Sequence, residues 1–377
     1  MTKEDFIKAG YVNFGYISPE LSSKDTYPEY IKENVTEAIE KIKNIQNEKT
    51  VTFAFMTDIH YSSTENHDIR TKRLMNAYEE IKNAVGIKML ILGGDYINDG
   101  TKEYKLNNYR AFREYLKNEK WFPVNGNHDD NSIWDECIEN ETSVNHLATE
   151  EMYDEFFSHL PEQNVKFGKD EKVLYYYFDD IKDKIRYICI DASDIPYSVN
   201  ENGKLNYVKQ HLYALSQEQI DWLTNEALVF SEEGWNVIFV AHTFPRWSDD
   251  EDAEYDNLAF LESLGDIIDS YKAGCDIDNK YFENEFENIV KAEFSKYKRA
   301  EIIACFGGHY HADFEQYSKT SVPFIYTGNV MMYKYRVPRI DGDKSELLFD
   351  IVTIDKENRT IYMTRVGAGE DRIIKYN

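Results

Sequence analysis

The chain has 377 residues, 42% of them hydrophobic and 30% charged, and its formal net charge is −26. This composition is that of an ordinary globular protein, and no apolar run approaches the roughly 20 residues that span a bilayer. The acidic charge repels long polyanions, so neither duplex nucleic acid nor an anionic membrane is expected as a partner. A phosphate substrate stays compatible with that charge, because bound divalent cations reverse the local field.

Residues 1–6 lack the apolar segment of a secretory signal. We therefore expect a cytoplasmic protein, or a secreted one if a leader preceded these residues. Cys189 and Cys305 lie inside apolar, strand-like runs, which predicts reduced cysteines in the core.

An amphipathic helix is predicted over residues 28–47 from the helical spacing of its apolar side chains. Residues 1–48 are interpreted as an N-terminal extension that wraps the outside of the fold. Residues 49–377 are interpreted as one catalytic domain, because no linker rich in Pro, Gly or Ser divides them. Two long insertions are expected in that domain, at about 131–172 and 246–300.

From residue 51 onward, strands and helices alternate. Helices are predicted over 68–85 and 105–117, and strands over 173–179 and 184–191. The sequence from Ser216 to Gln219 is typical of a capping box that opens a further helix.

The last two predicted strands, 347–354 and 360–366, form a terminal hairpin. The acidic run at 249–252 is interpreted as a solvated loop.

Five short polar motifs each follow an apolar run. They are Asp58-Ile59-His60, Asp95, Asn127-His128-Asp129, His242 and His309-Tyr310-His311. In α/β proteins, ligands bind beyond the carboxyl ends of the strands. This placement therefore predicts an α/β fold with one site that is built from all five motifs. Carboxylate, imidazole and carboxamide together suit borderline transition metals better than calcium or structural zinc.

Asp95, after two glycines, is the best candidate for a carboxylate that bridges two cations. Asp58 and His60 have an i, i+2 relation, as do His309 and His311. Residues so related project to the same side of a strand, so each pair is expected to reach one metal.

The carboxamide of Asn127 and the imidazole of His242 add neutral ligands and leave room for water. Two close metals activate a shared water, which predicts hydrolytic displacement, most plausibly at phosphorus. His128 is then the candidate catalytic imidazole, able to stabilise phosphoryl charge or protonate the leaving group. Either Asp129 or Asp99 can orient it, and the sequence does not choose between them.

The five motifs, in this order, resemble the calcineurin-like metallophosphoesterases, from about residue 50 to the terminal hairpin. The resemblance implies a four-layer sandwich in which two mixed β-sheets are flanked by helices. It implies two metal ions, of manganese, iron or zinc. One would be bound by Asp58, His60, Asp95 and His311. The other would be bound by Asp95, Asn127, His242 and His309.

The segment from Gly94 to Gly100 departs from the Gly-Asp-x-x-Asp-Arg-Gly of the Ser/Thr phosphatases in that family. The arginine is missing and the second aspartate, Asp99, is displaced by one position. This difference argues against a phosphoprotein substrate, and the Gly-His-x-His block is typical of small-molecule phosphodiesterases and phosphatases.

The main prediction is a metal-dependent hydrolase of a small phosphodiester or phosphomonoester, including nucleotides. A nuclease of the same family and a catalytically silent scaffold with the same fold are the alternatives. Tyr61, Arg246, Trp247 and the segment 331–336 are candidates to line the substrate cleft, with Arg246 binding phosphate and Trp247 stacking on a base or sugar.

Overall fold

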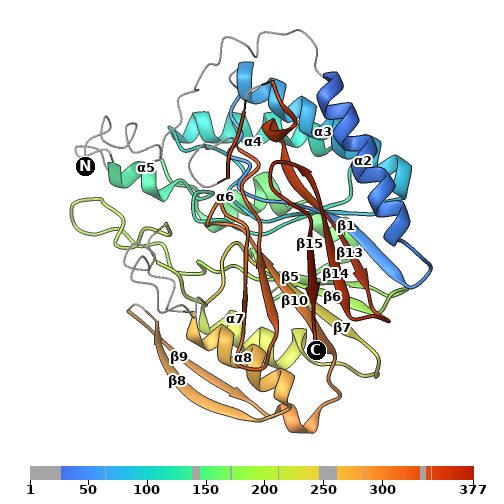
Figure 1. The fold of residues 1–377 in the computed structure, drawn as a ribbon. Coiled ribbons are helices and arrows are strands. Elements are labelled where there is room, and N and C mark those ends of the chain that lie inside the picture. Colours follow the sequence, from blue (N-terminus) through green and yellow to red (C-terminus); the bar gives the residue numbers. More distant parts are fainter. Residues whose placement is uncertain are drawn as a thin grey trace.

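Two mixed β-sheets face each other across the centre of the molecule (Figure 1). The computed structural model describes residues 27–63, 65–137, 145–169, 172–210, 212–245, 261–283, 285–331, 337–340 and 342–377. The first sheet has six strands in the order β15-β14-β13-β1-β2-β3. The second has seven in the order β11-β12-β10-β7-β6-β5-β4.

The first sheet comprises β1 (Thr50–Met56), β2 (Leu90–Leu92), β3 (Trp121–Pro123), β13 (Leu348–Asp355), β14 (Thr360–Gly367) and β15 (Arg372–Lys375). The second comprises β4 (Lys166–Phe167), β5 (Tyr176–Asp180), β6 (Ile185–Cys189), β7 (Asn236–Val240), β10 (Glu301–Gly307), β11 (Phe314–Tyr317) and β12 (Pro323–Tyr326). A separate hairpin pairs β8 (Ile277–Glu283) with β9 (Phe286–Ala292).

Helices cover the outer faces of both sheets. The α-helices are α2 (Glu29–Ile45), α3 (Glu65–Val85), α4 (Lys102–Leu116), α5 (Ser132–Cys137), α6 (Thr149–Met152), α7 (Gln217–Trp222) and α8 (Glu262–Ala273). Short π or 3-10 turns are η2 (Tyr153–Phe157), η3 (Leu160–Gln163), η4 (Leu223–Ala227), η7 (Phe294–Lys296) and η8 (Lys344–Glu346). The predicted fold class, two mixed sheets flanked by helices, is confirmed.

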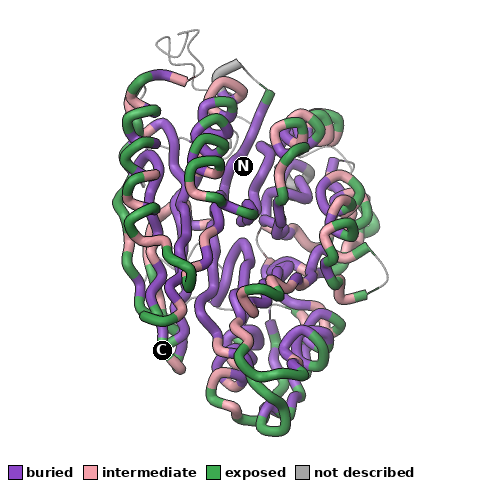
Figure 2. Tube along the Cα trace, turned by 90° about the vertical axis from the view of Figure 1, so that its right-hand side faces the viewer, coloured by how far each residue is buried: buried purple, intermediate pink, exposed green. Residues whose placement is uncertain are grey.

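The period-2 geometry of a strand assigns its two faces to two different cores. In β7, Ile238 and Val240 belong to the core between the sheets, whereas Val237 and Phe239 pack toward the helices of the second sheet. Buried strands therefore occupy the middle of the molecule, and exposed positions gather on the outer helices (Figure 2). Among the described residues, no helix combines the length and apolarity needed to cross a bilayer.

Parallel strands of each sheet end at the same level, which positions the site. In the first sheet Met56 pairs with Leu92, and Leu92 with Pro123. In the second sheet Val240 pairs with Phe306. The residues that follow these strands therefore emerge together at one edge, as the α/β geometry predicts.

Most predicted elements are present, with differences at particular places. The helix predicted over 28–47 is α2, and its Asn34 Oδ1 accepts a 2.8 Å hydrogen bond from the Gly367 amide at the end of β14. Residues 1–26 and the acidic run at 249–252 lie outside the described residues. The predicted hairpin forms as β13 and β14, but β15 follows it and adds an edge strand, so the hairpin is not terminal. Within the insertion predicted at 246–300, the structure has α8 and the β8–β9 hairpin, which no sequence pattern had indicated.

Only half of the predicted capping box forms. The Ser216 hydroxyl accepts a hydrogen bond from the Gln219 amide at 3.1 Å, as expected. The Gln219 side chain, however, bonds the backbone N–H and C=O of Asp191 at 3.0 and 2.9 Å. Gln219 thereby fastens α7 to the end of β6 instead of closing the box. Cys189 and Cys305 are buried free thiols, as predicted.

Candidate metal centre

The loops beyond the strand ends carry most of the expected ligands in an unusual backbone conformation. Asp58, His60, Asp95, His309 and His311 all have positive φ, between 44° and 70°. Side chains other than glycine rarely adopt this region, and such strain concentrates at functional sites. The predicted extended strand at Asp58 and His60 is therefore wrong. Strand β1 ends at Met56, and left-handed turns direct these two side chains toward one point.

The loops of the first sheet hold one another through their backbones. The amide of Asp58 donates to the Gly94 carbonyl at 3.0 Å, and that of His60 to the Asp95 carbonyl at 2.9 Å. The parallel pairing of β1 and β2 thus continues past the strands, to a bridge between Tyr61 and Ile97. This pairing fixes the spacing between the first and second motifs.

Glycines permit the close approach that the sequence suggested for Asp95. At Gly94 the φ is +95°, and a Cβ would lie 2.6 Å from His242 Nδ1 and 2.9 Å from the Gly126 Cα. A Cβ at Gly126 would collide with the backbone and the carboxylate of Asp95. Glycine is therefore required sterically at both positions.

Four side chains form a first group. One ligand atom from each of Asp58, His60, Asp95 and His311 lies within 4.8 Å of all the others. His311 Nε2 is 3.0 Å from Asp58 Oδ1, which is a buried oxygen. Two ligand atoms about 3 Å apart have a spacing that would suit a shared cation about 2 Å from each.

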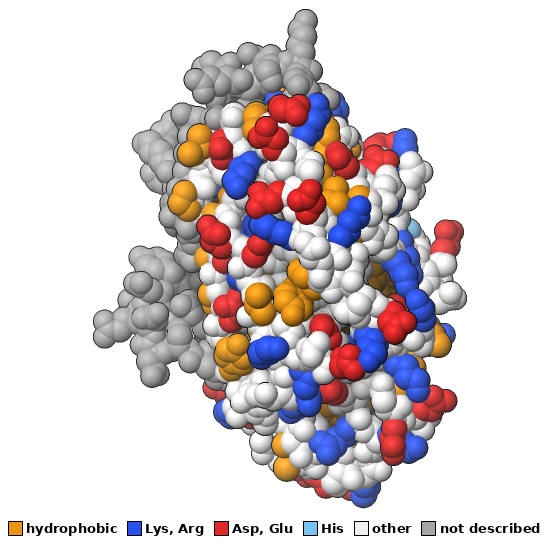
Figure 3. All heavy atoms as spheres, turned by 45° about the vertical axis from the view of Figure 1, so that its right-hand side comes forward, with side chains coloured by type: hydrophobic (Ala, Val, Ile, Leu, Met, Phe, Trp, Pro, Cys, Tyr) orange, Lys and Arg blue, Asp and Glu red, His pale blue; other side chains and the backbone are white. Residues whose placement is uncertain are grey.

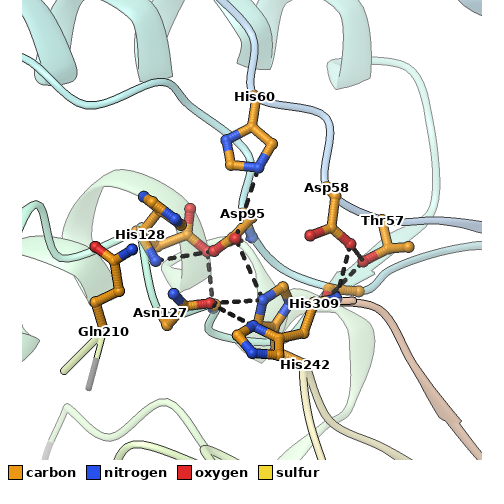
Figure 4. A network of polar contacts seen from close by, with 12 residues as sticks. Thr57, Asp58, His60, Asp95, Asn127, His128, Gln210, His242 and His309 are labelled. Atoms are coloured by element: carbon orange, nitrogen blue, oxygen red, sulfur yellow. Dashed lines mark hydrogen bonds and ion pairs between the residues drawn. The ribbon is translucent and has the colours of Figure 1, made fainter. Parts of the chain in front are cut away.

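Three further side chains extend this group (Figure 4). Asn127 Oδ1 lies 2.9 Å from His242 Nε2 and 3.0 Å from His309 Nδ1. Asp95 Oδ2 lies 3.3 Å from His242 Nε2 and 3.7 Å from His60 Nε2. Asp95 is thus the side chain between the two groups. All seven expected ligands are brought together, and their donor set fits divalent metal ions.

The ring orientation of His242 and the neutral rings of His60 and His309 favour metal binding. His242 Nδ1 donates to the Gly93 carbonyl at 2.7 Å, so Nε2 faces Asp95 and Asn127. Such an outer hydrogen bond fixes the tautomer of a ligating histidine. Burial lowers the pKa of His60 and of His309 to about 3, which keeps both rings neutral. Neutral imidazole is the form that binds a metal.

His128 contacts only one of the two carboxylates proposed to orient it. Its Nδ1 lies 2.5 Å from Asp99 Oδ2. Burial lowers the pKa of His128, but the charges of Asp99 and Asp95 outweigh that effect and raise it to about 9. Asp99 reaches the ring although it is displaced by one position from the Ser/Thr phosphatase pattern.

Asp129 has a different position from the one expected of a catalytic residue. Its Oδ2 accepts hydrogen bonds from the amides of Asp95 and Gly126 at 2.9 and 2.8 Å, and its Oδ1 from the amide of Tyr96 at 2.8 Å. The carboxylate therefore holds the backbone of two ligand loops together. Its expected place beside the His128 ring is corrected accordingly.

Two side chains near His128 were not singled out from the sequence. Lys105 is fully buried and donates to the His128 carbonyl at 2.8 Å. A lysine on the apolar face of the helix predicted over 105–117 was the available signal. Gln210 is drawn among the residues of the polar network in Figure 4, and its buried Oε1 accepts no hydrogen bond from the described residues. No pattern in the sequence distinguished it.

The residues expected to line the substrate cleft are not found there among the described residues. Tyr61 is 2% exposed, packs on Phe112 and donates from its hydroxyl to Asp68 at 3.2 Å. It therefore belongs to the core beneath the helices, which corrects its expected place in the cleft. Arg246, Trp247 and residues 332–336 lie outside the described residues, and Met331 is buried.

Comparison with known proteins agrees with this site. A family model described as calcineurin-like phosphoesterase matches residues 51–313, so the chain belongs to that family. A crystal structure of a dimetal phosphatase from Danio rerio is similar in fold, with a TM-score of 0.55 and 12% identity over 87% of this chain and 99% of that one. No curated protein sequence matches the chain.

Family membership and the cluster of ligands define the class of protein. The chain is a metal-dependent phosphoesterase, and the cluster of Asp58, His60, Asp95 and His311 could hold a divalent metal ion. The resemblance noted in the sequence is thereby confirmed.

Proposed function

We propose that this protein hydrolyses a small phosphomonoester or phosphodiester, nucleotides included, with two divalent ions that share Asp95. The position of Asp95 Oδ2, between His60 Nε2 at 3.7 Å and His242 Nε2 at 3.3 Å, is the observation that carries the proposal. Asp58, His60 and His311 complete the first site, and Asn127, His242 and His309 the second. This mixed set of nitrogen and oxygen donors suits manganese, iron or zinc.

The bound ions supply an activated water and neutralise charge on the phosphoryl group. The residues of the chain do the rest. Asp99 holds Nδ1 of His128, whose ring centroid lies 5.2 Å from that of His60, so Nε2 is the nitrogen proposed to act on the substrate. We propose that Nε2 donates a proton to the ester oxygen as its bond to phosphorus breaks, while water forms the new bond. Gln210, which is drawn with the polar network in Figure 4, is proposed to contact the substrate through its side-chain amide, whose buried Oε1 has no hydrogen-bond partner among the described residues.

The two alternatives have less support. A silent scaffold is disfavoured because every ligand of the five motifs is present in the chain. A nuclease needs a basic surface for the phosphate backbone. On the face drawn in Figure 3, acidic side chains are interspersed among the basic ones, and no continuous basic stripe crosses the described residues.

The test uses metal-stripped protein and two chromogenic esters, bis-p-nitrophenyl phosphate and p-nitrophenyl phosphate. Manganese, zinc, iron(II) or buffer is added back, and release of p-nitrophenolate is followed. We expect turnover only with added metal, and the preferred ester distinguishes a diesterase from a monoesterase. Metal binding without turnover of either ester, or turnover with buffer alone, contradicts the proposal.

A further inference from the structure

Lys105 is a buried ammonium group directly behind His128. It lies in the first turns of α4 and has no exposed surface. Its Nζ donates to the carbonyl of Ile97 at 2.6 Å and to that of His128 at 2.8 Å, and lies 3.4 Å from Asp99 Oδ1. These three acceptors match the three donors of an ammonium group.

Stability alone does not explain a lysine at this position. On the same face of α4, Tyr109, Phe112 and Leu116 are buried. An apolar side chain there would avoid the cost of desolvating a charge, and buried ion pairs are often no more stable than apolar packing. The role of the Lys105 ammonium group must therefore be inferred from its contacts.

Its contacts hold His128 at two separate points. Through the carbonyl, Lys105 fixes the backbone of His128. Through Oδ1 it fixes the rotation of the Asp99 carboxylate, whose Oδ2 lies 2.5 Å from Nδ1 of the His128 ring. One buried cation therefore holds both the backbone and the ring of His128.

We infer that Lys105 is a positioning residue, which holds the Asp99–His128 pair in the orientation needed to protonate the leaving group. This inference rests on the proposed role of His128. It adds that the contribution of Lys105 to the rate depends on the leaving group of the substrate. A nitrophenolate leaves without a proton, whereas an alkoxide or unsubstituted phenolate must receive one. Lys105 is therefore needed most for esters with poor leaving groups.

The experiment compares Lys105→Met with wild type, both loaded with manganese. The substrates are p-nitrophenyl, phenyl and ethyl phosphate esters that differ only in the leaving group. A well-placed general acid contributes on the order of 10²–10⁴-fold, so we expect roughly a 30-fold loss of kcat on the phenyl and ethyl esters. Loss on the p-nitrophenyl ester should stay within about 3-fold, with KM and metal content unchanged. Lys102→Met is the matched control, because Lys102 lies on the same helix and pairs with Glu151 at 2.6 Å. It should behave as wild type on all three esters.

Equal losses on all three esters, or a loss of metal, would show a merely structural role and overturn the inference. A double mutant with His128→Ala gives a second criterion, because Lys105→Met should cost little once His128 is gone. If the methionine variant does not fold, Lys105→Gln keeps a donor for one carbonyl and is judged by the same pattern. A wild type that hydrolyses none of the esters refutes the proposed function itself, whereas a uniform loss in an active background refutes only the role of Lys105.

Discussion

Gly308 and Thr57 touch across the two sheets, so closely that a Cβ at position 308 would collide with the Thr57 hydroxyl and the Asp58 carboxylate. Gly308 follows β10 in the second sheet, and Thr57 follows β1 in the first. The Thr57 hydroxyl donates to Asp58 Oδ2 at 2.7 Å, and the amide of His309 donates to the same oxygen at 3.0 Å. This contact sets the distance between the ligand loops of the two sheets.

Replacing Gly308 with alanine should therefore push these loops apart. We expect metal affinity to fall by roughly 10–100-fold, as for other changes that disturb the support of a ligand. Affinity is measured by titrating metal-stripped protein calorimetrically. Gly234→Ala is the control: its φ of +83° makes the change strained, but the space around it is open. That variant should lose about 1 kcal/mol of stability and no metal affinity. Wild-type affinity in Gly308→Ala would contradict this account.

Asp99→Asn should separate catalysis from metal binding. The amide can still meet the ring, but it lacks the charge that favours protonated His128, and its NH₂ group can face Nδ1 with the wrong tautomer. We expect kcat to fall on the order of 10²-fold on a phenyl ester, while two metal ions per chain are retained. Elemental analysis of the purified variant accompanies the kinetics. A loss of metal would mean that Asp99 acts as a ligand or supports one.

Asp129→Asn should have the opposite effect. Both oxygens of this carboxylate accept hydrogen bonds from backbone amides, and asparagine would turn an NH₂ group toward one of those donors. Hydrogen bonds to a charged group contribute about 1.5–3 kcal/mol, so we expect a loss of at least about 2 kcal/mol in urea unfolding. Metal affinity should fall with it. A variant as stable as wild type but with low kcat would instead assign Asp129 a direct role in the reaction.

Glu283 makes folding depend on pH at a place remote from the metals. It ends β8, and its Oε1 accepts a 2.8 Å hydrogen bond from the Ser263 amide in the first turn of α8. Burial raises the pKa of this carboxyl from 4.5 to about 7. Between these values the folded state holds a proton that the unfolded state releases, so stability from this group is present below about pH 4.5 and falls as pH rises toward 7.

Glu283→Gln should remove that dependence. Relative to wild type, the variant should gain on the order of 2–3 kcal/mol of unfolding free energy between pH 4.5 and pH 8. Urea unfolding at both pH values measures the change. Glu287→Gln, at an exposed position of the same hairpin that pairs with Lys280, is the control and should show no such trend. If the unfolding free energies of wild type and Glu283→Gln differ by the same amount at both pH values, the raised pKa of Glu283 is contradicted.

Much of this site could be read from the sequence because it lies where strands end. An apolar run followed by Asp, Asn or His marks both the strand and its ligand, and the register of β1, β2 and β3 brings the ends together. Period-3.6 spacing likewise marked α2 before the structure placed it. These predictions depend on local patterns that the chain carries at each element.

The remainder depends on contacts between distant segments. No local pattern marks Asp99 as the partner of His128. Asp99 lies 29 residues away along the chain, whereas Asp129 follows His128 directly, and only the fold turns Asp99 toward the ring. The left-handed turns at Asp58 and His60 arise from pairing with residues 94–96, not from their own propensity. Lys105 could not be predicted as a site residue, because lysines are rarely buried.

The most direct test of the two-ion site is the hydrolysis rate of metal-stripped protein as manganese is added stepwise, plotted against ions bound per chain. Because Asp95 lies between both groups of ligands, activity should rise to a maximum at two bound ions, and Asp95→Asn should bind neither ion tightly. Full activity at one ion per chain, or hydrolysis that does not depend on bound metal, would contradict the account.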